Sequence, residues 1–401
     1  MIRKMITFNN IDQRLYDEKG LEEDFKKTAK GKRKKPQVQR VREDLERHKT
    51  ILADQLRTNT FTKNQHSKEV INEASCKKTR TVQKPAYLYE QPAHHAIIRA
   101  LMPALMRGMY DLSCGSIPNR GAHYGKKYIE KWIRKDPANC KYILKFDIHH
   151  FFQSVPHRKL KKALKKKIKD KEILKKVFTI IDSCEEGLPI GYYSSQWFGN
   201  FYLTPLDHYI KEELHIKHMI RYMDDVVCFG RNKKELHKAK DKIEKFIKEE
   251  LGLEMKGDWQ VFRFDFISKK DKKRHGRPLD FMGFKFYRDR TTIRKSILNR
   301  TKRKVNKIKR KGKVTWKDAA SILSRMGYIR HTDTYGYYLR NIKPVIKIKV
   351  MKQLVSKHAR KEKKNGMDQK GRDAKRAAGR FRHNQQQNNR ISSEKADTDR
   401  T

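Results

Sequence analysis

The chain has 401 residues, enough for one large domain or for two to three subdomains that each bury a core. Hydrophobic residues make up 36% of it, which is low for a globular protein but excludes a wholly disordered composition. The 98 Lys and Arg residues outnumber the 46 Asp and Glu residues, giving a formal net charge of +52. Because such an excess repels itself, a polyanion, first of all nucleic acid, is the expected partner.

Several function classes are disfavoured by other features of the sequence. Residues 1–10 lack the apolar region of a secretory signal. No run of about 18 apolar residues predicts a transmembrane helix, so no membrane partner is expected. The five cysteines are far apart, without metal-ligand spacing, and therefore predict neither a disulfide framework nor a zinc site; a reducing, cytoplasmic location fits them: Cys76, Cys114, Cys140, Cys184 and Cys228.

Residues 1 to about 290 divide into two parts by composition. Residues 1–75 form a basic N-terminal extension, with a basic run at 30–35 and a helical pattern at 41–56. From residue 76 to about 290 the apolar content rises, and both helix and strand patterns appear. Only this second segment is expected to bury a mixed core of helices and strands.

The remainder is more basic. Residues 291–356 predict helices broken at Gly312, Gly327 and Pro344. Residues 357–401 contain no Leu, Val, Trp or Tyr, and this tail is expected to be disordered until it meets nucleic acid. The helices expected between these limits are 297–311, 316–326 after Thr315, and 335–341.

Two apolar stretches end in acids. Residues 142–148 predict a buried strand that delivers Asp147, and burying a carboxylate is costly unless a cation accompanies it. Residues 219–229 predict a hairpin with Asp224 and Asp225 at its turn. Adjacent acids at a turn are often plain turn chemistry, but these flanks are apolar rather than alternating, which favours a covered sheet whose turn faces a cleft.

The three acids together predict a metal centre. If both strands belong to one sheet, the carboxylates of Asp147, Asp224 and Asp225 meet at one edge, where they repel unless divalent cations neutralise them. Oxygen ligands and partial hydration suit Mg²⁺. Two such ions can activate a 3′-hydroxyl and stabilise a leaving pyrophosphate, which is the chemistry of nucleotidyl transfer.

With these motifs in place, the sequence resembles the reverse transcriptase family over roughly residues 76–345. The resemblance implies an α+β right-hand polymerase with fingers, a palm containing an antiparallel sheet, and a helical thumb. Residues 76–290 would be fingers and palm, and residues 291–356 the thumb. It rests on Tyr-Met-Asp-Asp at 222–225, Phe-Asp-Ile-x-x-Phe-Phe at 146–152, the substrate motif at 188–196, a fingers-like segment at 80–85 followed by His94-His95-Ala96, and a primer-grip hairpin at 279–284.

The resemblance also assigns roles. It implies an RNA template, a DNA or RNA primer, dNTPs, and two Mg²⁺ ions, for which Mn²⁺ can substitute, held at Asp147, Ile148, Asp224 and Asp225. Phe152 matches a steric gate against a ribose 2′-hydroxyl, and Ser195 is also a candidate N-cap. His94 and His95 are expected to be structural. The remaining substrate candidates are Arg80, Lys84, Ile190, Gly191 and Gln196, and those supporting the primer and the active site are Tyr222, Met223, Phe281 and Gly283.

The substrate motif narrows the subclass. Many relatives carry Gln-Gly-x-x-x-Ser-Pro, whereas this chain has Ile190-Gly191-x-x-x-Ser195-Gln196, as in reverse transcriptases of diversity-generating retroelements. That resemblance implies error-prone copying of a template-repeat RNA, with errors at adenines, to diversify a target gene. It also implies a small basic helical accessory protein. Candidate contact surfaces are the Lys-rich helix expected at 158–176, whose apolar positions share one face, and the tail from 357.

Three alternatives remain open at the level of sequence. The chain could serve another bacterial system: a retron, a group II intron or abortive infection. It could be an RNA-binding module on an inactive palm, although the intact acids argue against that. It could be a basic protein that compacts nucleic acid, which would leave the ordered motifs unexplained.

Overall fold

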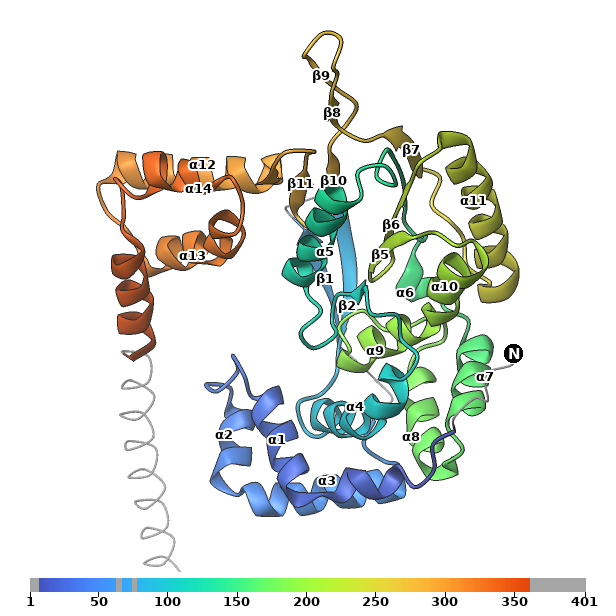
Figure 1. Ribbon diagram of the computed structural model, residues 1–401. Helices are drawn as coiled ribbons and strands as arrows, with labels where there is room; N and C mark the ends of the chain where they lie inside the picture. Colours follow the sequence, from blue (N-terminus) through green and yellow to red (C-terminus); the bar gives the residue numbers. More distant parts are fainter. Residues whose placement is uncertain (1–6, 63–66, 74–77, 361–401) are drawn as a thin grey trace, which may run out of the picture. The chain divides into compact units, whose positions relative to one another are not determined.

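The computed structural model describes residues 7–62, 67–73 and 78–360 (Figure 1). The side chains of residues 67, 72, 73, 78 and 80 are outside this description. The chain forms two compact units, one ending at Arg294 and the other beginning at Lys295. The described helices and largely antiparallel sheets confirm the α+β class.

The N-terminal extension is helical and belongs to the first unit. Asp44 accepts a hydrogen bond from the Arg47 amide at 3.2 Å, so the single helix expected at 41–56 is two helices. Arg99 of α4 binds the buried Asp24 of α1 at 2.9 Å, which anchors the extension to α4. The elements are a 3-10 turn (Asp12–Tyr16), α1 (Glu18–Thr28), α2 (Pro36–Glu43), α3 (Leu45–Thr58) and α4 (Glu90–Met106).

A five-stranded sheet lies at the centre of the first unit. Its strand order is β3-β5-β6-β4-β7; β3 pairs with β5 in parallel, and the other pairs are antiparallel. Residues on the two faces alternate, so one face packs on α11 and the other on α5, where Trp132 stacks on His218. These elements are β3 (Ser113–Cys114), α5 (Ala122–Lys135), β4 (Tyr142–Phe146), β5 (His218–Tyr222), β6 (Asp225–Gly230), α11 (Lys233–Phe246) and β7 (Gln260–Arg263).

Between β4 and β5 the chain is helical. The helix expected at 158–176 is wrong as a single element, because Ile168 is extended and bridges Phe8, and Asp170 then caps a new helix through the Glu172 and Ile173 amides. The helices are α6 (Phe151–Ser154), α7 (His157–Lys167), α8 (Lys171–Ile181), α9 (Tyr193–Tyr202) and α10 (Thr204–His208), which continues as a π-helical turn (Tyr209–Glu213); a similar turn (Ile247–Leu251) extends α11.

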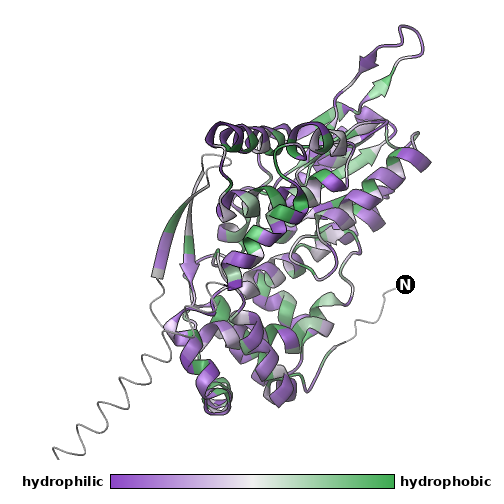
Figure 2. Cartoon of the chain, turned by 90° about the vertical axis from the view of Figure 1, so that its left-hand side faces the viewer, coloured by the Kyte–Doolittle hydropathy of each residue, from purple (hydrophilic) through white to green (hydrophobic). Residues whose placement is uncertain are grey.

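Smaller β-elements complete this unit: the hairpin β1 (Ser67–Glu73) and β2 (Lys78–Lys84), the hairpin β8 (Phe266–Ile267) and β9 (Arg274–His275), and a sheet of β10 (Leu279–Phe281), β11 (Phe284–Phe286) and β12 (Thr291–Ile293). Figure 2 shows hydrophobic residues gathered where helices and strands meet, with hydrophilic residues on the outer faces of helices. Within the described ranges no helix combines the length and apolar character needed to cross a bilayer.

The second unit contains the helices expected from sequence. Thr315 caps α13 through a capping box with Asp318, and the buried faces of α12 and α13 include Val305, Ile308 and Ile322. Residues 348–360 are helical, so residues 357–360 are not the disordered tail that we expected; residues 361–401 lie outside the described part. The elements are α12 (Lys295–Lys311), α13 (Trp316–Arg330) and α14 (Tyr335–Tyr337), which continues as a π-helical turn (Tyr338–Ile342).

Candidate active site

The central sheet brings the first acid opposite the third. Phe146 pairs with Val226 in the antiparallel ladder of β4 and β6, so the next residue, Asp147, lies across from Asp225. Residues opposite each other in such a pair have their Cα atoms about 4.5–5.5 Å apart and point to the same face. The two carboxylates, 78 positions apart in sequence, therefore share one end and one face of the sheet.

The hairpin between β5 and β6 carries the remaining acid. Tyr222 pairs with Asp225, which leaves a two-residue turn of Met223 and Asp224. We expected both acids at the turn; Asp224 is there, whereas Asp225 is the first residue of β6. Met223 has φ 58°, in the left-handed region that side-chain-bearing residues rarely adopt, so surrounding contacts must hold the turn.

The charges of Lys145, Asp147 and Asp224 all act on the carboxylate of Asp225. Its Oδ2 lies 3.4 Å from Lys145 Nζ, and its buried Oδ1 has no hydrogen-bond partner among the described residues. Burial, opposed by Lys145 and reinforced by the charges of Asp147 and Asp224, raises the pKa of Asp225 to about 7. The charges of Asp147 and Asp224 thus act on Asp225, and Lys145 compensates its buried carboxylate only in part.

The incompletely compensated charge of Asp225 raises the question of whether its carboxylate fits a cation. Within the described ranges there is no group of three His, Cys, Asp or Glu side chains already arranged to hold a metal ion. However, the buried unpaired oxygen of Asp225, opposite Asp147, is the kind of donor that a hard divalent cation takes. The donor chemistry therefore fits such an ion, which Asp225 and Asp147 would hold.

The segment just before β7 fixes the end of the strand that leads to Asp147. The main-chain oxygen of Asp147 accepts a hydrogen bond from the Lys256 amide at 2.9 Å, and Ile148 bridges Met255. The Ile148 amide donates to Asp147 Oδ1 at 3.1 Å. Ile148, a predicted metal ligand, has a buried hydrocarbon side chain with no donor atom, so only its main-chain oxygen could serve such an ion.

Lys145 connects the acids with the predicted primer-grip hairpin. Besides pairing with Asp225, its ammonium donates to the main-chain oxygen of Asp280 at 3.0 Å and lies 5.8 Å from the ring centroid of Phe281. Sequence reasoning missed Lys145. The alternation of the strand could have found it, because a residue two positions before Asp147 faces the same side.

The hairpin itself is tightly built. Phe281 is fully buried and pairs with Phe284, and the turn residues Met282 and Gly283 both have positive φ (51° and 84°), as a type I′ turn requires. The oxygen of Gly283 accepts from the Arg294 amide at 2.9 Å. Phe281 and Gly283 therefore shape the hairpin from within.

A buried polar network supports the turn between β5 and β6. Arg221 is fully buried; its guanidinium binds Asp207 at 2.6 and 2.7 Å and donates to the main-chain oxygen of Met223 at 2.8 Å. Asn200 accepts from Arg221 at 3.1 Å and donates to Met223 Sδ at 3.3 Å. Sequence reasoning missed this network, although an Arg within an apolar strand indicates a buried partner.

The substrate motif forms the loop that leads into α9. The oxygen of Ile190 accepts from the Gln83 amide of β2 at 2.8 Å. Gly191 has φ 114°, and a Cβ there would lie 2.3 Å from Gln83 O, so only glycine permits this approach. Ser195 is not an N-cap: it is buried inside α9 and donates to Pro189 O at 2.8 Å. Gln196 accepts from Ser116 at 2.8 Å.

The other predicted substrate residues lie on two elements near this loop. Phe152 belongs to α6 and packs against Phe151. Both rings lie close to Gly199 of α9, where an added Cβ would be 3.0 Å from Phe151 and 3.4 Å from Phe152. Lys84 is exposed and pairs with Glu69 across the β1–β2 hairpin. The backbone of Arg80 is in β2, and its side chain lies outside the described residues.

The similarity of the chain to known proteins is clearest at the level of a family. A family model for reverse transcriptase (RNA-dependent DNA polymerase) matches residues 71–286, more than half of the chain. No curated protein matches. Similar solved structures include apo telomerase from Candida tropicalis (14% identity over 56% of this chain and 46% of that chain, TM-score 0.42) and telomerase from Candida albicans in complex with a TWJ fragment of telomeric RNA (11% identity, 69% and 54%, TM-score 0.40). The chain spans about half the length of these telomerase chains.

Proposed function

The chain belongs to the reverse transcriptase family, and from that premise we propose that it is an RNA-directed DNA polymerase that extends a DNA or RNA primer along an RNA template. The observation that carries the proposal is the position of Asp147 opposite Asp225, on one face of the sheet and beside Asp224. Such an edge of carboxylates is costly to build for packing alone, because each charge opposes the others.

The proposed catalytic residues are Asp147, Asp224 and Asp225, with the main chain of Ile148 as a further ligand. Two Mg²⁺ ions, or Mn²⁺ in their place, would supply charge neutralisation to the attacking and leaving oxygens. Before an ion binds, Lys145 partly neutralises Asp225 at 3.4 Å. Because Lys145 also donates to the primer-grip hairpin, it ties the position of the primer end to the acids.

The nucleotide site is proposed on the surface formed by β2, α6 and the loop before α9. Gly191 keeps this loop against β2, and Phe152 would act as the gate against a 2′-hydroxyl. Arg80 and Lys84 of β2 would attract the triphosphate, and Ser195 and Gln196 would keep the loop in shape. Tyr222 and Met223 would support the primer end, and the helices from Lys295 to Ile342 would form the thumb.

Within the family, we assign the chain to diversity-generating retroelements on the basis of Ile190 and Gln196. A Gln at position 190 could hold the nascent base pair by a hydrogen bond, whereas Ile cannot. Selection of the incoming nucleotide by base-pair geometry should therefore be weaker. Adenines of the template-repeat RNA should then be miscopied. The partners would be that structured RNA and a small basic helical accessory protein, in the cytoplasm of a prokaryotic cell. A retron, group II intron or abortive-infection enzyme is the alternative within the same chemistry.

Primer extension on a defined RNA template tests the polymerase assignment. With Mg²⁺ or Mn²⁺ and dNTPs, the wild type should extend the primer, and Asp224→Ala should reduce extension by several orders of magnitude. The matched control is Asp241→Ala, an exposed acid of α11. A wild type that binds RNA but extends no primer under these conditions would establish the RNA-binding alternative on an inactive palm.

Sequencing the cDNA tests the subclass. Wild-type product should carry substitutions concentrated opposite template adenines, and Ile190→Gln should lower their frequency severalfold while leaving other errors unchanged. Equal adenine errors in both proteins would remove the proposed role of Ile190. Paired template and variable repeats in the neighbouring DNA would separate this subclass from retron and intron enzymes.

A further inference from the structure

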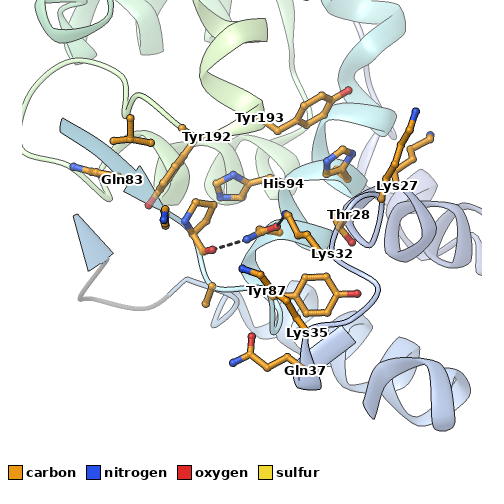
Figure 3. A pocket seen from close by; sticks show the side chains of 18 of the residues that line it. Lys27, Thr28, Lys32, Lys35, Gln37, Gln83, Tyr87, His94, Tyr192 and Tyr193 are labelled. Carbon is orange, nitrogen blue, oxygen red and sulfur yellow. Dashed lines mark hydrogen bonds between the residues drawn. The ribbon is translucent and has the colours of Figure 1, made fainter. Parts of the chain in front are cut away.

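A basic cavity of about 810 Å³ extends from the proposed nucleotide surface to the N-terminal extension. Lys84, Gly191 and Gln196 of that surface line it, and Figure 3 shows Tyr192 on one side of it and Lys27 on the other. The cavity is therefore part of the nucleotide site. A second concentration of positive charge, outside that site, lies on the β8–β9 arm (residues 266–275).

The β8–β9 arm extends away from the other elements of the first unit (Figure 1). Its two strands pair Phe266 with His275 and Ile267 with Arg274, and residues 268–273 form its tip. Ile267 is 51% exposed, so the arm covers little of the core. A hairpin that buries so little surface is at best marginally stable by itself, and its presence is not explained by packing.

The base of the arm is nevertheless held rigidly. Arg274 forms ion pairs with the buried Asp265 and, at 2.8 Å, with Asp289. The guanidinium of Arg263 lies 4.7 Å from the ring centroid of Phe266. These contacts fix the direction of the arm, so a ligand that binds its tip has less conformational entropy to remove.

The tip of the arm carries uncompensated positive charge. Asp271, the one acid in residues 268–273, accepts from the Lys273 amide at 3.0 Å and from His275 at 2.7 Å, so its carboxylate closes the turn. Neighbouring ammonium groups repel one another unless an anion neutralises them, so a polyanion is the expected ligand. The tip has four exposed lysines that make no ion pair with any described residue: Lys269, Lys270, Lys272 and Lys273.

The arm leaves the central sheet at the end opposite the three acids. The last residue of β7, Arg263, lies beside Tyr142, the first residue of β4. The arm follows Arg263, whereas Asp147 follows the other end of β4. At the usual rise per residue these two ends of the strand are about 16 Å apart. A ligand at the tip is therefore distinct from a nucleotide or a primer end at the acids.

The shape of the arm favours double-stranded DNA over double-stranded RNA. The major groove of B-form DNA, about 12 Å wide and about 8.5 Å deep, admits a two-stranded β-ribbon. From Phe266 to Lys270 the chain spans up to about 13 Å, enough to bring the lysines among the phosphates and base edges of the groove. An A-form helix has a deep, narrow major groove that excludes such a ribbon. We propose that the β8–β9 arm binds double-stranded DNA by entering its major groove, a DNA site separate from the RNA–DNA hybrid formed by copying.

Binding measurements without dNTPs or divalent ions test the arm separately from catalysis. The ligands are a blunt DNA duplex, an RNA duplex and an RNA–DNA hybrid of the same sequence, followed by fluorescence anisotropy over a range of KCl concentrations. For Lys269→Gln/Lys270→Gln/Lys273→Gln, we expect affinity for the DNA duplex to fall roughly tenfold or more. The log–log salt slope for DNA should decrease by about 3 if three phosphate contacts are lost, and affinity for the other two duplexes should stay unchanged.

The matched control removes three exposed lysines of α11: Lys233→Gln/Lys234→Gln/Lys238→Gln. A second variant shortens the arm by replacing residues 268–273 with Asn-Gly, which keeps the pairing of Ile267 with Arg274 around a two-residue turn. It should lose at least as much DNA affinity as the triple variant of the tip. Thermal unfolding of each variant shows whether the fold persists.

Groove-specific competitors test the mode of binding. Methyl green, which occupies the major groove, should displace the wild type from the DNA duplex, and netropsin, which occupies the minor groove, should not. Displacement by netropsin alone would overturn the proposal. So would an equal loss of DNA affinity in both triple variants, an equal loss for the RNA duplex or the hybrid, or wild-type affinity in the shortened arm.

The DNA site and the polymerase function fail in different ways. If the wild type binds the DNA duplex through the arm but extends no primer, the polymerase function fails and the DNA site stands. If the wild type extends primers normally and the triple variant of the tip binds every duplex like the wild type, the DNA site fails and the polymerase function stands.

Discussion

Arg221 and Asp207 form a two-pronged ion pair, at 2.6 and 2.7 Å, in which both side chains are fully buried. Ser113 joins the pair by donating to Asp207 at 2.6 Å. The Arg221 guanidinium also donates a hydrogen bond to the main-chain oxygen of Met223. The pair therefore fixes the turn that carries Asp224 relative to α10 and β5. A buried pair of this kind adds little net stability, so its value lies in fixing the strained turn.

Removing Arg221 tests this role. Arg221→Met leaves Asp207 buried without its partner, and we expect the free energy of unfolding to fall by about 3–5 kcal/mol. The double variant Arg221→Met/Asp207→Leu removes both charges and should recover most of that loss in denaturant unfolding. Primer extension should stay well below the wild type in the double variant, because Met223 still lacks its donor. Full recovery of extension together with stability would show that the pair has no positioning role.

Lys145 should compete with divalent ions for Asp225. In Lys145→Met the ammonium that lies 3.4 Å from Asp225 is absent, so the Mg²⁺ concentration at half-maximal extension should fall severalfold. The maximal rate should also fall, about tenfold, because the primer-grip hairpin loses its bond from Lys145. Steady-state extension across a Mg²⁺ titration measures both, with the exposed Lys141→Met as control. An unchanged or raised Mg²⁺ midpoint would exclude this competition.

Gly191 should tolerate no side chain. Its φ is 114° and a Cβ at this position would come within 2.3 Å of Gln83 O, so Gly191→Ala must separate the loop from β2. Backbone strain of this kind costs about 1–3 kcal/mol, and the KM for dNTPs should rise as the loop moves. Gly257→Ala, where a Cβ meets nothing within 4 Å, is the matched control in thermal unfolding and extension assays. Equal behaviour of the two variants would contradict the predicted strain.

The strands and the position of the acids could be predicted because each is a local pattern. Apolar runs of β-branched and aromatic residues end at Asp147 and flank Asp224, and period-two alternation then places the acids on one face. The helices of the second unit were equally accessible, since Thr315 and Asp318 form a recognisable cap.

What could not be predicted depends on contacts between distant segments. The helix expected at 158–176 breaks because Ile168 bridges Phe8, 160 positions earlier. Ser195 looked like a cap, but its hydroxyl turns inward to Pro189. Neither Lys145 nor Arg221 belongs to a motif, and their importance follows from Asp280 and Asp207, which only the fold brings near them.

His95 gives a pH dependence whose sign follows from its surroundings. Burial, with Lys27 and Lys32, lowers the pKa of His95 in the folded state to about 4 from an ordinary value of 6.5. The unfolded chain therefore binds the proton more readily, so the stability contribution is complete above about pH 6.5 and is lost as the pH falls toward 4. The wild type should lose on the order of 3 kcal/mol of unfolding free energy over this window through His95.

His95→Phe keeps a ring for Tyr193 to stack on but removes the titration, so its unfolding free energy should depend less on pH between 6.5 and 4. Urea unfolding at several pH values in that window measures the difference, with the exposed His275→Gln as control. Parallel pH profiles for wild type and His95→Phe would mean that burial, with Lys27 and Lys32, does not lower the pKa of His95 in the folded state.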